Sequence, residues 1–374
     1  MPKYTEFTVG LVIFLFLFFS FFLFFYQKGN RLSKNLLGIF FLSQGLAVSD
    51  VFLMISGSYA KFPQFAFILN SLPLVYGPLL MLLTKSVMER NYQLRKKDFL
   101  HFLPYVIFFL LFIFLFHAHS LDYKKEFLRR ASSDPGAISV IVSFLIFTVI
   151  GGYILWCFQR IQSYRKQIKE EVSNVDKINL GWLQMTLFGF AAIMLLTLLI
   201  QLLITVLPEY AVLNILLFIL LVGMLLFIMS AIIRGLKSDV IFATSFETYN
   251  KKNPPGKVFA NVDEEKLNRL KNYMNSEKPF LDPSLSLKEL ANKLGLPSRE
   301  LSILINQGTE QPFFDFVNSY RIKFAQNKIQ NAVDAKYTIL EAMFASGFNS
   351  KSSFNTAFKK QCGLTPTQWK NIKR

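Results

Sequence analysis

The sequence predicts an all-helical protein in which a bundle of membrane-spanning helices precedes a helical cytoplasmic domain. Hydrophobic residues make up 52% of the 374 residues and charged residues only 17%, against roughly 25% charged residues in soluble domains. Long apolar segments are confined to residues 7–233, and apolar residues recur at helical spacing after residue 260. The 41 Lys and Arg outnumber the 24 Asp and Glu, which gives a net charge of +17 and suits an anionic partner.

Seven apolar segments are long enough to cross a membrane, which takes about 20 residues for about 30 Å of hydrocarbon. The first is too long for the core of a signal peptide and is followed by no cleavage site of small residues. The second contains Asp50 and the third contains Pro73 and Pro78, which membrane helices tolerate because neighbouring groups satisfy the freed carbonyls. The predicted spans are residues 7–26, 36–56, 65–84, 99–117, 137–158, 180–207 and 211–233.

The basic residues of the connecting loops predict the orientation, because Lys and Arg accumulate in short cytoplasmic loops. The first, third and fifth loops hold 13 basic residues, and the opposite side holds six, four of them in the fourth loop. We therefore expect the N-terminus outside and the C-terminus in the cytoplasm.

The apolar pattern ends after Ile233, and residues 235–374 carry 21 basic and 13 acidic residues. Because the run Asn253-Pro254-Pro255-Gly256 breaks regular structure, residues 235–262 are expected to be a linker. This linker would join a membrane domain, residues 1–234, to a C-terminal domain, residues 263–374.

The C-terminal domain contains a short helix pair. Ser286 and Glu289 form a capping box at the start of a helix with apolar residues at i, i+3, i+4 and i+7. Gly295 ends this helix and Pro297-Ser298 starts the next, which is typical of a helix-turn-helix motif whose second helix enters a major groove. The outward residues of this recognition helix that we expect to contact DNA are Ser298, Arg299, Ser302 and Asn306.

A second pair follows, in which a helix from Ile339 to Ser346 is broken by Gly347 and the next helix is capped by Asn349 or Ser350. A long helix that begins at Pro312 lies between the pairs. It could hold the two recognition helices roughly 34 Å apart, about one DNA turn. The ammonium groups of Lys neutralise DNA phosphates, and the side-chain amide of Asn can form hydrogen bonds with adenine. The residues expected to contact DNA here are Asn349, Ser350, Lys351, Ser352, Asn355, Thr356 and Lys359.

These runs resemble the AraC/XylS family of bacterial transcription regulators. Leu287-Lys-Glu-Leu-Ala-Asn-Lys-Leu-Gly-Leu296 resembles its first helix-turn-helix, and Phe316-Val-Asn-Ser-Tyr-Arg-Ile-Lys-Phe-Ala325 its connecting helix. Gly347-Phe-Asn-Ser-Lys-Ser-Ser-Phe354, then Phe358-Lys-Lys and Gly363-Leu-Thr-Pro366, resembles its C-terminal signature in order and spacing. The resemblance covers residues 264–374 and implies DNA binding and transcription regulation. The spans ahead resemble a membrane-bound branch of the family, which implies that the chain lies in the inner membrane of a bacterium.

The sequence departs from the family pattern at two places. One is the stretch before Gly347, Ala342-Met-Phe-Ala-Ser346, and the other is the turn at residues 308–312. Both departures bear on DNA sequence preference rather than on the fold. The inward-facing residues of the domain are expected to determine its fold rather than to contact DNA. They are Leu290, Ala291, Gly295, Leu301, Phe354, Phe358 and Pro366.

Polar residues of the membrane domain form a second group, at the outer ends of the predicted spans: Asp50, Asn70, Gln201 and Asn214. Polar groups inside a membrane are costly and usually face the bundle interior or a cavity. Hydrogen bonds between helices are one interpretation, and an outward-facing pocket for a small-molecule or lipid signal is the other.

Two functions follow from these patterns. The first is a receptor and transcription regulator in one polypeptide, with double-stranded DNA, the lipid bilayer and a second copy of the chain as candidate partners. The second is a membrane enzyme or transporter with a helical appendage, although the chain shows no glycine-rich phosphate loop and no inverted repeat. Cys157 and Cys362 are too far apart in sequence to suggest a metal-ligand pair or a redox pair. The chain has only three His and two Cys, and Asp50 is the lone carboxylate within the spans, so no metal, cofactor or catalytic residue is expected. The spans could also only tether a regulator.

Overall fold

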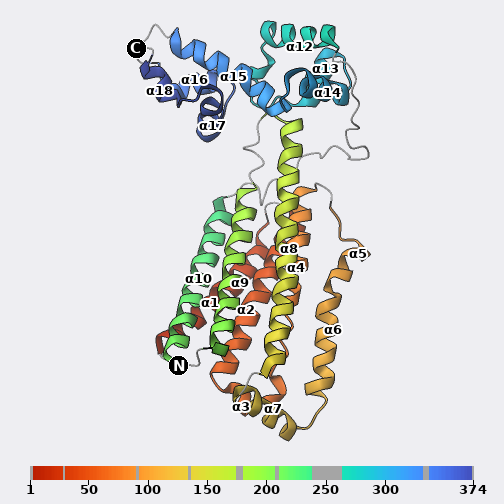
Figure 1. Cartoon of the computed structure of the whole chain (residues 1–374), viewed down its shortest axis with the longest axis vertical. Coiled ribbons are helices and arrows are strands. Elements are labelled where there is room, and N and C mark those ends of the chain that lie inside the picture. The colour runs from red at the N-terminus through yellow and green to blue at the C-terminus, as the bar shows by residue number, and fades with distance from the viewer. Residues whose placement is uncertain are drawn as a thin grey trace. The chain divides into compact units, whose positions relative to one another are not determined.

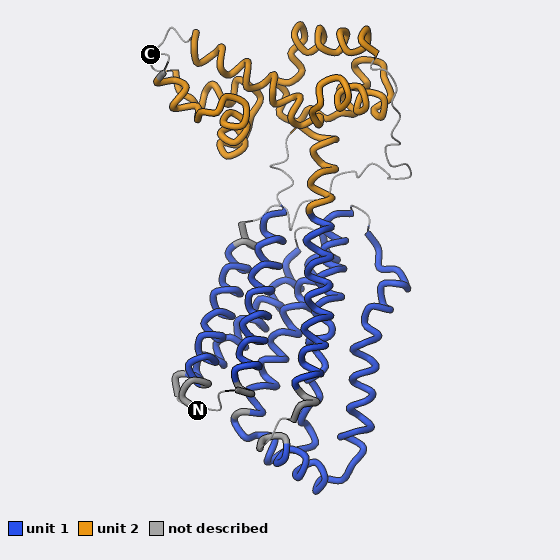
Figure 2. The backbone as a smooth tube through the Cα atoms, viewed as in Figure 1, with its two compact units in different colours: residues 1–161, 180–249 blue, residues 162–179, 250–374 orange. Residues whose placement is uncertain are grey.

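The computed structural model describes residues 3–27, 30–89, 92–133, 136–173, 180–206, 210–237, 263–331 and 337–372. The chain divides into two compact units, which Figure 2 shows in different colours. Unit 1 comprises Met1–Ile161 and Leu180–Tyr249, and unit 2 comprises Gln162–Asn179 and Asn250–Arg374. All regular elements among the described residues are helices apart from one isolated bridge, so the all-helical prediction is confirmed.

Unit 1 is built mainly of long apolar helices that run alongside one another (Figure 1). Short helices connect them at the ends. The elements in chain order are α1 (Lys3–Phe25), α2 (Arg31–Ile55), α3 (Ser58–Lys61), η1 (Pro63–Phe65), α4 (Pro73–Met88), α5 (Lys96–Phe99), η2 (Leu100–Phe102), α6 (Leu103–Phe112), η3 (Ile113–His117), α7 (Leu121–Ser133), α8 (Gly136–Glu171), α9 (Gly181–Val206) and α10 (Tyr210–Lys237).

Six segments of the described residues are long and apolar enough to cross a membrane. They are Thr5–Phe25, Arg31–Met54, Lys96–His117, Val140–Glu171, Gly181–Leu203 and Asn214–Ile233. These six overlap predicted spans one, two and four to seven. The third expected span, residues 65–84, differs, because its helix begins only at Pro73 and runs to Met88 with 16 residues. Pro73 is at the first helical turn, where a missing N–H costs nothing. Seven spans therefore stay a prediction.

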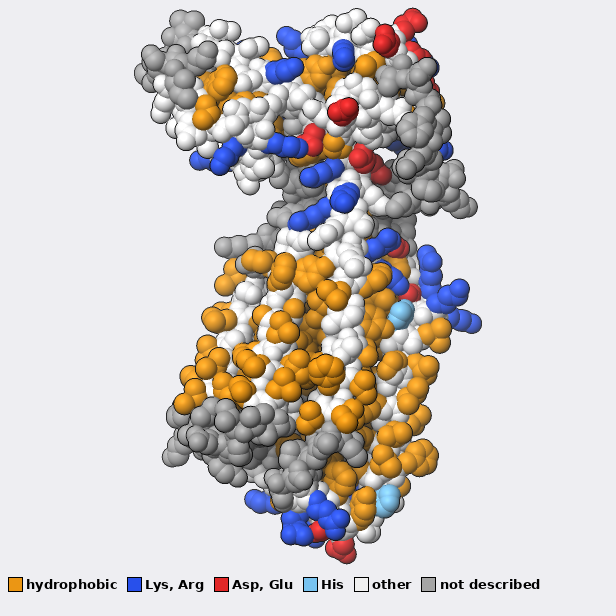
Figure 3. Space-filling view, in the orientation of Figure 1, with side chains coloured by type: hydrophobic (Ala, Val, Ile, Leu, Met, Phe, Trp, Pro, Cys, Tyr) orange, Lys and Arg blue, Asp and Glu red, His pale blue; other side chains and the backbone are white. Residues whose placement is uncertain are grey.

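Aromatic residues fill the centre of unit 1. The Phe40 ring lies 5.1 Å from the Phe190 ring and 6.0 Å from the Tyr76 ring, and the Phe41 ring lies 6.1 Å from Phe227. Helices approach closely where a glycine permits it, since a Cβ on Gly77 of α4 would lie 2.3 Å from the Tyr153 side chain of α8. Small residues allow the same close approach in membrane helix bundles. Many large hydrophobic side chains of unit 1 are exposed, and Figure 3 shows them spread over one face of its helices, which suits contact with lipid.

Unit 2 contains short helices around two apolar cores that share the helix α15. The elements are α12 (Glu264–Ser276), η5 (Pro279–Leu281), α13 (Leu287–Leu294), α14 (Ser298–Thr309), α15 (Phe313–Gln330), α16 (Ile339–Ala345), α17 (Lys351–Cys362) and α18 (Pro366–Ile372). The first half of α15 contributes Phe313, Phe316 and Val317 to the first core, and its second half contributes Ile322, Ala325 and Ile329 to the second. Of the expected linker, residues 238–262 lie outside the described residues.

Candidate DNA-binding surface

The first helix-turn-helix motif consists of α13, a turn and α14. The Ser286 hydroxyl accepts a hydrogen bond from the Glu289 N–H at 3.3 Å, and the Glu289 carboxylate accepts one from the Ser286 N–H at 2.9 Å. Gly295 ends α13 with a φ of 69°, a conformation that glycine adopts without the penalty of a Cβ. The predicted capping box and the predicted turn are confirmed.

Burial of one side of α14 determines which side chains remain available to DNA. Leu301 and Ile305 are fully buried against Leu290 and Ala291 of α13. The predicted contact residues lie on the other side. Arg299 is exposed, and Ser298, Ser302 and Asn306 are half-buried.

The second motif consists of α16, a turn at Gly347 and α17. Gly347 has a φ of 85°, and a Cβ there would lie 2.6 Å from the backbone oxygen of Phe280. The turn of the second motif therefore packs against the backbone that precedes the first motif. The cap of α17 is Ser350, whose hydroxyl accepts a hydrogen bond from the Ser353 N–H at 3.4 Å.

The outward side of α17 carries mainly lysines and small polar residues. Phe354 and Phe358 are fully buried, so the rest of the helix faces away from the core. Neither Lys351 nor Lys359 has a described carboxylate within 4.0 Å, whereas Lys360 pairs with Asp315 of α15 at 2.9 Å. Two of the predicted residues, Ser350 and Asn355, are half-buried. The exposed ones are Asn349, Lys351, Ser352, Thr356 and Lys359.

The two motifs are joined by α15, which has 18 residues and so extends about 27 Å. Pro312 precedes it with a φ of −66° and donates no backbone hydrogen bond, as expected at a helix start. Because both cores include side chains of this one helix, α15 fixes the spacing of α14 and α17.

Arg321 of α15, which the sequence patterns did not single out, connects the parts of unit 2. Its side chain is 1% exposed. Its Nε donates to the Phe280 backbone oxygen at 2.7 Å, and Nη2 donates to the Asp282 backbone oxygen at 2.7 Å. The guanidinium also lies over the Phe348 ring of the second motif at 5.7 Å. Burial lowers the pKa of Arg321 to about 10, so the group stays charged near neutral pH.

The end of α8, from Gln162 onward, belongs to unit 2 (Figure 2). Ser173 is buried, and both its N–H and its hydroxyl donate to the Leu285 backbone oxygen, at 3.2 and 2.6 Å. The Glu170 carboxylate accepts a hydrogen bond from the Asn306 side-chain amide at 2.8 Å. The sequence patterns assigned these residues only to a basic loop, so this contact with a predicted DNA-contacting residue was not anticipated.

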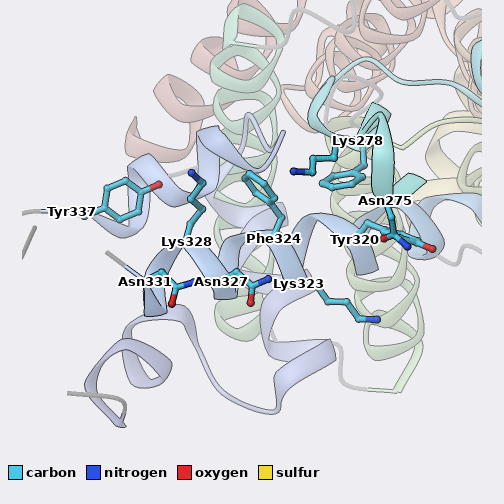
Figure 4. Close-up of a pocket in the computed structure, with 10 residues that line it drawn as sticks. Asn275, Lys278, Tyr320, Lys323, Phe324, Asn327, Lys328, Asn331 and Tyr337 are labelled. Carbon is cyan, nitrogen blue, oxygen red and sulfur yellow. The ribbon is translucent and has the colours of Figure 1, made fainter. Parts of the chain in front are cut away.

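A basic groove of about 700 Å³ runs along α15 (Figure 4). The Nζ atoms of Lys278 and Lys328 lie 5.9 and 5.6 Å from the centre of the Phe324 ring. Cations interact favourably with an aromatic face at such distances. Lys323 and Tyr337 line the groove as well.

The polar residues of unit 1 lie on separate elements. Asp50 of α2 is buried and accepts a hydrogen bond from the Tyr59 hydroxyl of α3. Asn70 is exposed in the turn before α4, and Gln201 and Asn214 are half-buried in α9 and α10. Unit 1 contains a cavity of about 220 Å³, but none of these four polar residues lines it. Its lining includes Leu36 and Phe102.

Two helix-turn-helix motifs on one connecting helix define a class of DNA-binding domain. A protein-family model described as a helix-turn-helix domain, of the AraC type, matches residues 290–372. No curated protein and no solved structure matches the chain. Residues 290–372, from within α13 to α18, are therefore an AraC-type DNA-binding domain of the kind that regulates transcription.

Proposed function

We propose that the protein is a membrane-bound, sequence-specific transcription regulator. One observation carries this proposal: a single chain joins six apolar helices of membrane-spanning length to an AraC-type domain. The outward sides of α14 and α17 carry Arg299, Lys351 and Lys359 together with small polar side chains. These groups suit phosphate oxygens and base edges.

We infer that the two recognition helices contact different parts of the DNA. Arg299 is exposed near the start of α14, and a guanidinium can form two hydrogen bonds with guanine. The side chains of Lys351 and Lys359 on α17 are point charges that suit phosphates. The first motif would then read bases and the second would hold the DNA backbone.

We propose that the N-terminus lies outside the bacterial cytoplasmic membrane and the DNA-binding domain inside. The loop charges support this orientation. It is also supported by the end of α8, since the start of the expected fifth cytoplasmic loop belongs to the same compact unit as the DNA-binding domain. Reporter fusions at Ser58 and at the C-terminus should report opposite sides of the membrane. A result with both on one side would contradict seven spans.

We further propose that the membrane domain senses a small-molecule or lipid signal near its outer end. Asp50 and Tyr59 support this, because they form a buried polar pair on two elements in an apolar environment. Asn70, Gln201 and Asn214 are the other proposed contacts. Replacing the five polar residues by apolar ones of similar size should abolish the response to a stimulus but leave DNA binding intact. If the variant keeps both the response and DNA binding, the spans only tether the regulator to the membrane.

The experiment that tests the proposed function is genome-wide mapping of bound DNA with the protein left in its membrane. The control is a triple variant, Arg299→Ala, Lys351→Ala and Lys359→Ala. We expect discrete sites in the wild type that the variant loses. An identical map for both proteins would overturn the proposal.

A further inference from the structure

We propose that residues 162–173, the end of α8 and the two residues that follow it, inhibit DNA binding by occupying the first recognition helix, and that DNA displaces them. This inference rests on the proposed DNA-binding function and adds its regulation. The inhibiting segment lies within the same compact unit as the helix it occupies. It also continues, without a break in the helix, from the apolar segment that begins at Val140.

The inhibitory contact is the hydrogen bond between Asn306 and Glu170. Asn306 lies on the outward side of α14 and donates from Nδ2 to the Glu170 carboxylate at 2.8 Å. An asparagine that reads adenine uses the same amide, donating from Nδ2 and accepting at Oδ1. Asn306 cannot hold Glu170 in this geometry and grip a base edge at the same time. The two interactions therefore exclude each other.

The charge of Glu170 acts in the same direction. A carboxylate on a surface that meets phosphates repels them and offsets the attraction of nearby lysines. Lys169, the neighbouring cation, is directed elsewhere, because its Nζ lies over the Phe314 ring at the start of α15, 5.9 Å from its centre. Of these two neighbouring charges, Glu170 is therefore the one that meets the recognition helix.

A second set of contacts holds the segment in place without touching the reading surface. Ser173 is bonded to the Leu285 backbone oxygen and accepts two hydrogen bonds from Arg321, and Val172 forms a bridge with Ser286. These partners precede the first helix-turn-helix motif or lie on the connecting helix. The anchor at Ser173 and the blocking contact at Glu170 are thus separate and can be changed one at a time.

The position of the contact suggests how a membrane signal could reach DNA. Glu170 is on the last turn of α8, which is a single helix from Gly136 to Glu171. A shift or rotation of the apolar part of such a helix moves its last turn. Because docking of the segment and DNA binding are mutually exclusive, each weakens the other by the same factor.

The test uses the full chain in nanodiscs and a fluorescent duplex of random sequence spanning about four helical turns, at low salt. Glu170→Ala is compared with Glu277→Ala, a matched control that removes one negative charge from an exposed glutamate at the end of α12. We expect Glu170→Ala to bind DNA about three- to tenfold more tightly than the wild type. The control should change affinity less than about twofold, as a lone surface charge does.

Three outcomes decide the matter. A gain specific to Glu170→Ala supports the inhibition. Equal affinities for Glu170→Ala and Glu277→Ala, with a wild type that binds, overturn the inhibition and leave the proposed function standing. Absence of binding by every form overturns both.

Hydrogen exchange gives a readout that needs no variant. In the free protein the Ser173 amide is bonded to the Leu285 oxygen at 3.2 Å and should exchange slowly. Saturation with the same duplex should speed exchange of the Ser173 amide. Unchanged or slower exchange in the DNA complex would overturn displacement of the segment.

Discussion

Arg321 donates two of its five N–H groups to Ser173, a residue 148 positions earlier in the chain. Nη1 reaches the Ser173 backbone oxygen at 3.0 Å, and Nη2 reaches its hydroxyl at 3.1 Å. The other three donors reach the backbone oxygens of Phe280 and Asp282 and the side chain of Asn318. Every donor of the buried guanidinium has a partner, which is the condition under which a protein interior tolerates such a group.

Replacement of Arg321 by Met should destabilise unit 2 by about 3 kcal/mol, because three backbone oxygens, two of them in buried hydrogen bonds, lose their donors. Ser173→Ala should cost only about 1 kcal/mol, since it removes one hydroxyl and keeps the backbone acceptor. The chain has three tryptophans. With Trp156 and Trp182 changed to Phe, urea unfolding followed by Trp369 fluorescence reports on unit 2 alone. Equal losses for both variants would contradict the central role of Arg321.

The two turn glycines should differ in their tolerance of alanine. Gly295 has a positive φ, and a Cβ added there would meet no atom within 4 Å, so Gly295→Ala should cost about 1–2 kcal/mol for the left-handed conformation. Gly347→Ala adds a Cβ only 2.6 Å from the Phe280 backbone oxygen, and the two motifs must shift apart. It should therefore lower the free energy of unfolding by clearly more than Gly295→Ala. The Trp369 measurement ranks the two, and the reverse order would contradict the packing described for this turn.

The arginine and the lysines of the two recognition helices should respond differently to removal. Lys351→Ala or Lys359→Ala should weaken binding to all duplexes alike and reduce the salt slope by about one unit per lost phosphate contact. Arg299→Ala should weaken specific binding more than random binding, with about 1–3 kcal/mol of discrimination lost at one base pair. Titrations of full-length variants at several salt concentrations distinguish these patterns. Equal losses for Arg299→Ala on both duplexes would make it a phosphate contact.

Acid should weaken the second motif through Glu341. Hydrogen bonds from the Thr338 N–H and hydroxyl, at 2.6 and 2.8 Å, hold the pKa of Glu341 below its ordinary value. A carboxyl group with a lowered pKa in the folded state adds stability above its unfolded pKa, about 4.3, and this stability is lost as pH falls through the folded pKa. Urea unfolding at pH 7 and below pH 4 should show a smaller acid loss in Glu341→Gln than in the wild type. A wild-type loss no larger than that of the variant would contradict this role.

Local sequence patterns predicted the helix ends and the turns well, because a cap or a glycine acts within a few residues. The box at Ser286 and Glu289 and the left-handed Gly295 follow from spacing alone. The start of α4 at Pro73 could not be predicted from hydropathy, since residues 65–72 are apolar enough to resemble a span although they form turns. The helix α7 was likewise interpreted as a charged loop.

The contacts that connect distant segments could not be predicted. Arg321 lies among apolar residues of α15, which was the one available signal for a buried cation, but its partner at Ser173 is in another part of the chain. Glu170 meets Asn306 across 136 positions, and no periodicity in either segment encodes that pairing. The outward residues of α14 and α17 were predictable because their helices each have one buried side.

The most direct test of the central claim is whether membrane-embedded protein binds DNA through these two helices. Full-length protein in nanodiscs is mixed with fragmented genomic duplexes at low salt and separated from free DNA by size, and the bound fragments are sequenced. We predict that duplexes comigrate with wild-type nanodiscs, with a subset enriched, and that the variant with Arg299, Lys351 and Lys359 all changed to Ala retains none. Nanodiscs that carry folded wild-type protein but no DNA, or a triple variant that retains the same fragments, would contradict it.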